Sequence, residues 1–179
     1  MNKYDQFSQI EEYPTEVSVS TITYRIVDSL GFRYFWATEG LGDKDGAFEP
    51  GNGGRNLHQN LSHIYNMVDF IANFFEGETT VFPEKEHSLD LVDLRYKTLD
   101  RILEIKQKIR KMEGQFLEAN SIRVEVNQEP MQFSMWHIYN GPLTDVFYHI
   151  GQVVSFRRTL GKPIDPAVQP FLGVKLETA

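Results

Sequence analysis

Residues 56–75 read NLHQNLSHIYNMVDFIANFF, and this stretch decides the expected fold. At about 100° per residue, its apolar side chains fall on one side of a helix and on an adjoining stripe. These side chains are Leu57, Leu61, Ile64, Met67, Val68, Phe70, Ile71, Phe74 and Phe75. Because they cover about half of the circumference, the pattern predicts a helix embedded among other helices.

The two histidines of this helix differ in their expected direction. His63 lies within the adjoining apolar stripe, whereas His58 lies about 140° away among polar residues. The pattern therefore predicts that His63 points inward and that His58 points outward.

The rest of the chain is expected to add three more helices. Apolar spacing predicts them over residues 15–41, 88–112 and about 133–160, the last with a break or kink at Gly141-Pro142. Glycine-rich residues 40–54 and residues 78–87 predict loops. The alternation over residues 121–127 indicates either a short strand or an extended connector.

These elements predict one all-α domain over residues 1–179, folded as a four-helix bundle with its core at about 15–165. Residues 1–14 are then an irregular lead-in, and residues 162–179, with three prolines, are an irregular tail.

Composition excludes several function classes. With 25 acidic and 18 basic residues, the chain has a net charge of −7, which argues against nucleic acid and anionic membranes as main partners. The basic run over residues 106–111 alternates with apolar residues and is expected to be a solvated helix face. The lack of cysteine excludes thiol catalysis and cysteine-based zinc sites. Without a signal-peptide pattern or a membrane-length apolar stretch, we expect a cytoplasmic location.

Asp145 and His149 stand four residues apart in the apolar stripe of the last helix. A buried carboxylate is costly unless it is paired or binds a metal. Three interpretations are open. The two residues form a hydrogen-bonded core pair, or they are two ligands of a metal with His63 as the third, or Asp145 reaches solvent.

In the metal interpretation, three protein ligands leave coordination positions open, as at catalytic metals. Two imidazoles and one carboxylate suit zinc, nickel, iron or manganese. Gln152, beside the pair, is a candidate for orienting a ligand.

The other histidines are weaker candidates. His137 precedes the expected kink and is a candidate acid or base in a pocket above the metal. His87 lies in a charged loop and is expected to be exposed. The neighbouring aromatic residues Trp136, Tyr139 and Tyr148 are expected to pack in the interior.

Two segments resemble the DinB-like superfamily of metal-dependent helical proteins. Leu61-Ser62-His63-Ile64 is similar to the second-helix motif of that family. Residues 145–152, reading DVFYHIGQ and followed by Arg157-Arg158 and Gly161-Lys162-Pro163, resemble its last bundle helix. His63 and His149 match two of the three usual metal-binding histidines, and Asp145 stands where the family most often has the other.

The resemblance implies a four-helix bundle with a long crossover between the second and third helices, and frequent homodimers. Some relatives are metal-dependent transferases or isomerases that use low-molecular-weight thiols. We therefore expect a divalent-metal-dependent thiol transferase or hydrolase that acts on a small molecule. The alternative is a non-enzymatic dimeric binding or stress-response protein in which the interior Asp145–His149 pair is structural.

Overall fold

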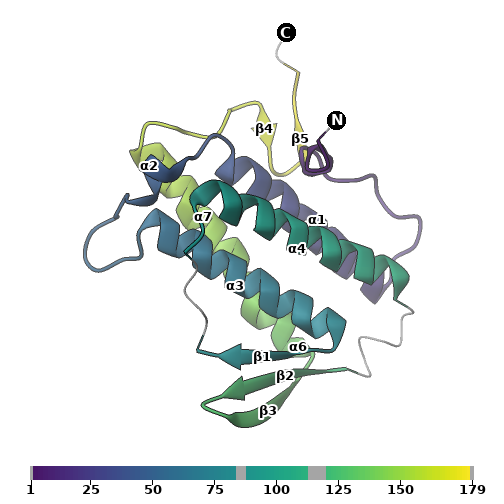
Figure 1. Ribbon diagram of the computed structural model, residues 1–179. Helices are drawn as coiled ribbons and strands as arrows, with labels where there is room; N and C mark the ends of the chain where they lie inside the picture. Colours follow the sequence, from purple (N-terminus) through teal and green to yellow (C-terminus); the bar gives the residue numbers. More distant parts are fainter. Residues whose placement is uncertain (1, 84–87, 113–119, 178–179) are drawn as a thin grey trace.

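The computed structural model describes residues 2–83, 88–112 and 120–177. The described chain is mostly helical, with a three-stranded and a two-stranded sheet (Figure 1). Its helices are η1 (Asp5–Phe7), α1 (Val19–Thr38), α2 (Asp43–Gly46), α3 (Leu57–Glu76), α4 (Leu91–Lys111), α6 (Trp136–Ile138), η2 (Tyr139–Leu143) and α7 (Thr144–Thr159). Its strands are β1 (Thr79–Phe82), β2 (Ser121–Val126), β3 (Glu129–Ser134), β4 (Val168–Gln169) and β5 (Val174–Lys175).

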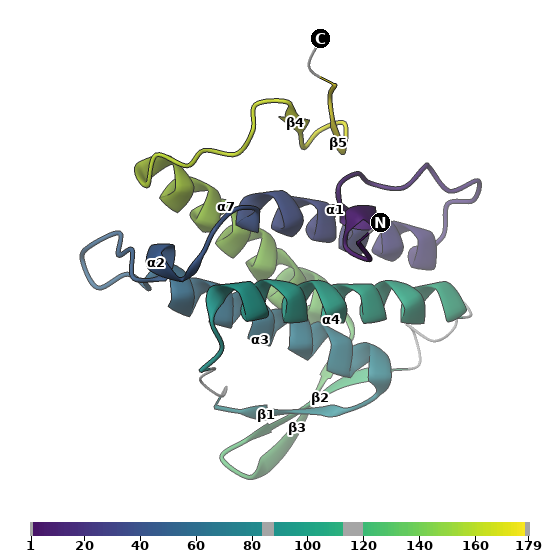
Figure 2. The same cartoon turned by 45° about the horizontal axis from the view of Figure 1, so that its top comes forward.

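The long helices α1, α3, α4 and α7 pack around a shared apolar core. Helix α3 contacts α4 and α7, and α1 contacts the same two helices from the other side. Helices α3 and α4 run in one direction, whereas α1 and α7 run in the other (Figure 1 and Figure 2). Helices α3 and α4, which follow one another among the long helices, therefore lie parallel to each other.

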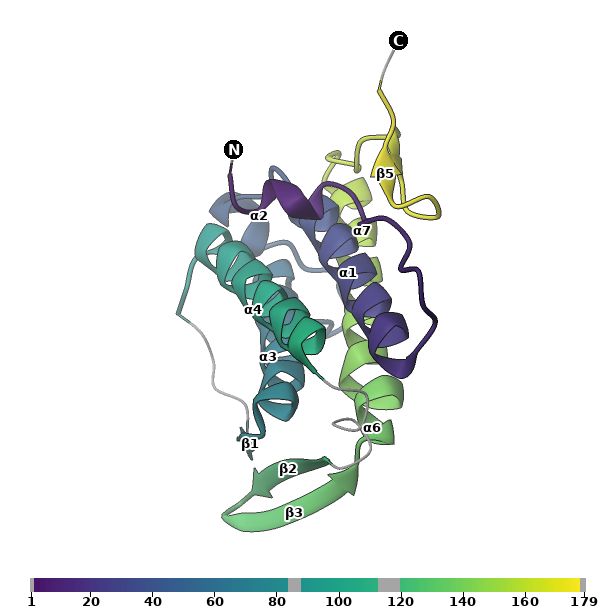
Figure 3. The ribbon, with the colours of Figure 1, turned by 90° about the vertical axis from the view of Figure 1, so that its right-hand side faces the viewer.

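The all-α prediction is too narrow, because a sheet lies at one end of the helices (Figure 3). Strand β2 pairs parallel with β1 and antiparallel with β3. Ile122 and Val124 of β2 are buried, which explains the alternation of residues 121–127 and confirms the strand interpretation. The prediction of a plain loop over residues 78–87 missed β1.

The predicted lead-in is irregular apart from η1, but two of its aromatic residues belong to the core. Tyr4 is 9% exposed and Phe7 is fully buried. A Cβ atom on Gly31 of α1 would lie 2.6 Å from the Phe7 ring, so the ring fills the space that this glycine leaves. The core therefore begins at the N-terminal segment and not at residue 15.

The basic run over residues 106–111 is only partly the solvated face that was predicted. Lys108, Arg110 and Lys111 are exposed, but Lys106 is 2% exposed. Its Nζ atom lies 2.5 Å from Oδ1 of the buried Asp28 on α1. A helical wheel cannot show this, since the partner comes from another helix.

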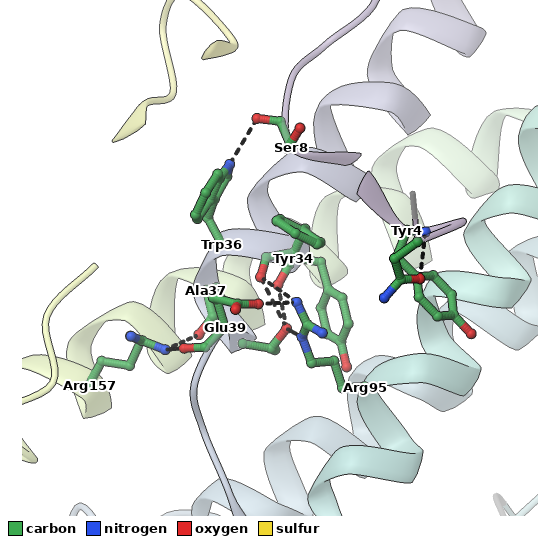
Figure 4. A network of polar contacts seen from close by, with 11 residues as sticks. Tyr4, Ser8, Tyr34, Trp36, Ala37, Glu39, Arg95 and Arg157 are labelled. Atoms are coloured by element: carbon green, nitrogen blue, oxygen red, sulfur yellow. Dashed lines mark hydrogen bonds and ion pairs between the residues drawn. The ribbon is translucent and has the colours of Figure 1, made fainter. Parts of the chain in front are cut away.

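Two arginines from neighbouring helices hold the C-terminal end of α1 (Figure 4). Arg95 of α4 donates to Thr38 Oγ1 at 3.1 Å and to the Glu39 carboxylate at 2.5 Å. Arg157 of α7 donates to the backbone oxygens of Ala37 and Glu39 at 3.3 and 2.5 Å. Arg157 thus donates to carbonyl groups at the end of α1, where the last carbonyls lack partners within the helix. Together the two arginines connect α1 to both α4 and α7.

The tail after α7 is partly ordered into the β4–β5 hairpin, which contacts the N-terminal segment through Gly173 and Ile10. In the residues that the structure describes, no helix has both the length and the apolarity needed to cross a bilayer.

Candidate metal centre

The three ligand candidates from the sequence come together between α3 and α7. His63 Nε2 lies 3.4 Å from Asp145 Oδ2, and His149 Nε2 lies 3.6 Å from Asp145 Oδ1. The two imidazole rings meet edge to face, with centroids 4.5 Å apart. One ligand atom from each of the three residues lies within 4.8 Å of the others, so the group could hold a metal ion.

Local sequence features set the two helices that carry this group. The side chain of Asn56 caps α3 by accepting from the Gln59 backbone N–H at 2.8 Å, and Gly77 ends the helix in the left-handed conformation. The predicted kink is confirmed at Gly141, whose φ of −103° and ψ of −113° are not helical. Helix α7 then starts at Thr144, which places Asp145 in its first turn.

His149 is oriented by two amide groups. Its Nδ1 atom lies 2.9 Å from Asn60 Oδ1 and 2.8 Å from Gln152 Oε1. Asn60 Nδ2 donates in turn to the His149 carbonyl at 3.2 Å, which fixes the orientation of this amide. Because both partners of Nδ1 are acceptors, Nδ1 carries the proton and the lone pair of Nε2 faces Asp145. In this tautomer Nε2 carries no proton and is able to coordinate a metal.

Burial lowers the pKa of His149, and the charge of His63 acts in the same direction. The hydrogen bond with Gln152 and the charge of Asp145 oppose this shift without cancelling it. The imidazole is therefore neutral at neutral pH and able to coordinate a cation.

The group opens to solvent on the side of the carboxylate. Side-chain exposure is 8% for His149, 16% for His63 and 44% for Asp145. The interpretation that Asp145 reaches solvent is thus correct, and it is compatible with the two contacts to histidine. The wheel overestimated the burial of Asp145, because this residue lies at the end of α7 and not in its middle.

The remaining histidines lie elsewhere. His137 is exposed on α6, with its ring 5.6 Å from that of Phe133, and it is not part of the three-residue group. His58 points away from the three-residue group, and its Nε2 atom lies 2.7 Å from the Leu89 carbonyl oxygen. This side of α3 therefore faces the residues that precede α4 and not open solvent. His87 lies outside the residues that the structure describes.

The predicted packing of the aromatic residues is correct only for Tyr139, which contacts the core and whose hydroxyl lies 2.6 Å from Thr23 Oγ1. Trp136 and Tyr148 are each 67% exposed. The Tyr148 ring lies 5.6 Å from that of His149, at the edge of the group of three ligand candidates.

Asn60 is the functional candidate that sequence reasoning missed. It is fully buried and lies three residues before His63 on the same helix. Its spacing from His63 was a usable signal, because residues at i and i+3 share a helix face.

Comparisons of this chain with protein-family models, with curated proteins and with solved structures found no match. The resemblance to the DinB-like superfamily therefore stays a prediction.

Proposed function

We propose that this chain is an enzyme that binds one divalent metal ion through His63, Asp145 and His149. The observation that carries the proposal is the spacing of the ligand atoms. A tetrahedral ion with bonds of about 2.0–2.2 Å separates its ligand atoms by about 3.4 Å. His63 Nε2 lies 3.4 Å from Asp145 Oδ2 and His149 Nε2 lies 3.6 Å from Asp145 Oδ1, so each imidazole is at about this spacing from one of the two carboxylate oxygens. With one ligand atom taken from each residue, the three atoms lie within 4.8 Å of one another.

The alternative, a structural Asp145–His149 pair, has less support. A separation of 3.6 Å is too long for an N–H···O hydrogen bond. The proton of His149 is already engaged on the other side of the ring, by Asn60 and Gln152. Asp145 is also 44% exposed, so its charge does not need a buried partner.

In the proposed enzyme, the ion is zinc, nickel, iron or manganese, and it keeps positions open on the side of Asp145. An ion in such a site lowers the pKa of a bound water or thiol and so supplies a nucleophile at neutral pH. We propose a transferase or hydrolase of the DinB-like kind, which acts as a cytoplasmic homodimer on a small molecule such as a low-molecular-weight thiol. His137 is proposed as an acid or base near the substrate.

The test is metal analysis of protein purified without a histidine tag, followed by replacement of the ion with cobalt(II). We expect close to one ion per chain and a cobalt absorption spectrum of low coordination number. Addition of 2-mercaptoethanol should produce a thiolate-to-cobalt charge-transfer band. Protein that binds neither zinc nor cobalt at micromolar concentration would refute the proposal.

The amides around His149 give a further prediction. Asn60→Leu is expected to weaken zinc binding by about 10- to 100-fold, because it removes one of the two acceptors that hold the imidazole. Gln152→Glu is expected to strengthen binding, because a carboxylate acceptor makes the imidazole more basic. Competition with a chromogenic chelator measures both affinities. Equal zinc affinity in the two variants would contradict this role.

A further inference from the structure

A groove of about 830 Å³ lies on the side of α7 that faces away from the metal-ligand group. Ile150, Val154 and Arg158 of α7 line it. At about 100° per residue, they project from the face opposite to that of Asp145 and His149. Helix α1 forms the second wall, and the tail over residues 164–170 forms the third. Figure 2 shows this tail running past α7 and α1.

The walls of the groove are mainly apolar. The rings of Phe32 and Trp36 come from α1, and Phe147 and Val154 come from α7. Sites for small molecules commonly have volumes of about 300–1,000 Å³, apolar walls and a few polar groups that orient the ligand. The groove has the volume and lining of such a site.

Its polar groups are mainly cationic. Arg158 is exposed, and it makes no ion pair within the described residues. In the described part of the chain, the Arg33 side chain makes one hydrogen bond, which is long at 3.5 Å and goes to the Pro170 carbonyl oxygen. The acidic residue of the lining, Asp165, is paired with Lys175 at 2.7 Å. Two guanidinium groups therefore keep free donors at an apolar groove, in a chain whose net charge is −7.

We propose that this groove is a binding site for an amphipathic carboxylate, separate from the metal centre. The apolar part of the ligand lies against Trp36 and Phe147, and its carboxylate is bound by Arg33 and Arg158. Guanidinium groups suit this role because their fork of N–H donors matches the two oxygens of a carboxylate.

The two tryptophans of the chain provide a direct assay. Trp136 is 67% exposed and does not line the groove, so Trp136→Phe leaves Trp36 as the reporter. Decanoate, below its micelle concentration, is expected to change the Trp36 fluorescence saturably. It should bind at least about tenfold more tightly than decanol or decyltrimethylammonium, because only decanoate carries a negative charge. The double variant Arg33→Gln/Arg158→Gln should reduce decanoate affinity to that of decanol.

Gly151→Leu tests the position of the site. A Cβ atom at Gly151 would meet nothing within 4 Å, and the residue lines the groove. Leucine favours a helix more than glycine does, so the variant should fold while its side chain occupies the groove. We expect it to lose decanoate binding. Ser155→Leu, exposed on the same helix and outside the lining, is the matched control and should bind as the parent does.

Zinc content should stay unchanged in Gly151→Leu, which separates this proposal from that of the metal centre. Equal affinity for the three amphiphiles, or unchanged binding in Gly151→Leu, would overturn the carboxylate site. A third result would also overturn it: the protein binds no decanoate, and sedimentation shows a dimer that the Arg33→Gln/Arg158→Gln variant no longer forms. A second copy of the chain would then occupy the groove.

Discussion

His149→Ala is expected to reduce zinc affinity by more than about 100-fold. This loss is larger than the loss of about 10- to 100-fold that follows when a residue that only orients a ligand is removed. The variant removes one of three proposed ligands and leaves His63 and Asp145, which together hold an ion weakly. Isothermal titration of metal-free protein with zinc measures the loss. Circular dichroism should show that the helices are retained.

The variant also leaves Oδ1 of the buried Asn60 without its partner on the imidazole, which costs stability of about 1–3 kcal/mol, while Nδ2 keeps the backbone carbonyl of residue 149. Asp145→Ala provides a second test, because its side chain is 44% exposed and its loss leaves no unpaired group in the core. His137→Ala is the matched control, since it removes an exposed imidazole from outside the group. Zinc binding that survives in both His149→Ala and Asp145→Ala would exclude the proposed centre.

Asp28→Leu is expected to destabilise the fold by about 3–5 kcal/mol, the range found when one partner of a buried ion pair is removed. Asp28 is 1% exposed, and Lys106 is 2% exposed at 2.5 Å from it. Without Asp28, the ion-pair partner that remains for the Lys106 ammonium among the described residues is the partly exposed Glu11, 3.0 Å away. The ring centroids of Phe7 and Tyr24 lie 5.4 and 5.3 Å from the ammonium. Urea unfolding, followed by circular dichroism, measures the change.

The double variant Asp28→Leu/Lys106→Met separates the charge from the packing. It also removes the buried ammonium that has lost Asp28, and apolar replacements of buried ion pairs are often tolerated. We therefore expect it to be more stable than Asp28→Leu alone. It should not fully recover, because Asp28 Oδ2 also accepts from the Glu11 backbone N–H at 2.8 Å. A double variant that is less stable than the single one would contradict this account of Lys106.

The long helices could be predicted because their signals are local. The prediction of residues 56–75 for the second helix differs by one residue at each end from α3, Leu57–Glu76. Its apolar spacing, the Asn56 cap and Gly77 all act within a few residues of the helix. The same holds for Asp145 and His149, whose shared face follows from their spacing of four residues.

The features that the sequence did not predict depend on distant partners. Strand β1 has only four residues and becomes a strand by pairing with β2, which starts at Ser121. The burial of Lys106 depends on Asp28, 78 residues away. The contact of Asn60 with His149 spans 89 residues, and no local pattern carries such information.

The contact of Phe7 with Gly31 links the volumes of two positions that are far apart in the chain. With the Phe7 ring in place, position 31 has no room for even a methyl group. In a library of random variants, mutants with a larger residue at position 31 should regain their fold through a smaller residue at position 7. For the same reason, these two positions should vary together in other sequences that adopt this fold.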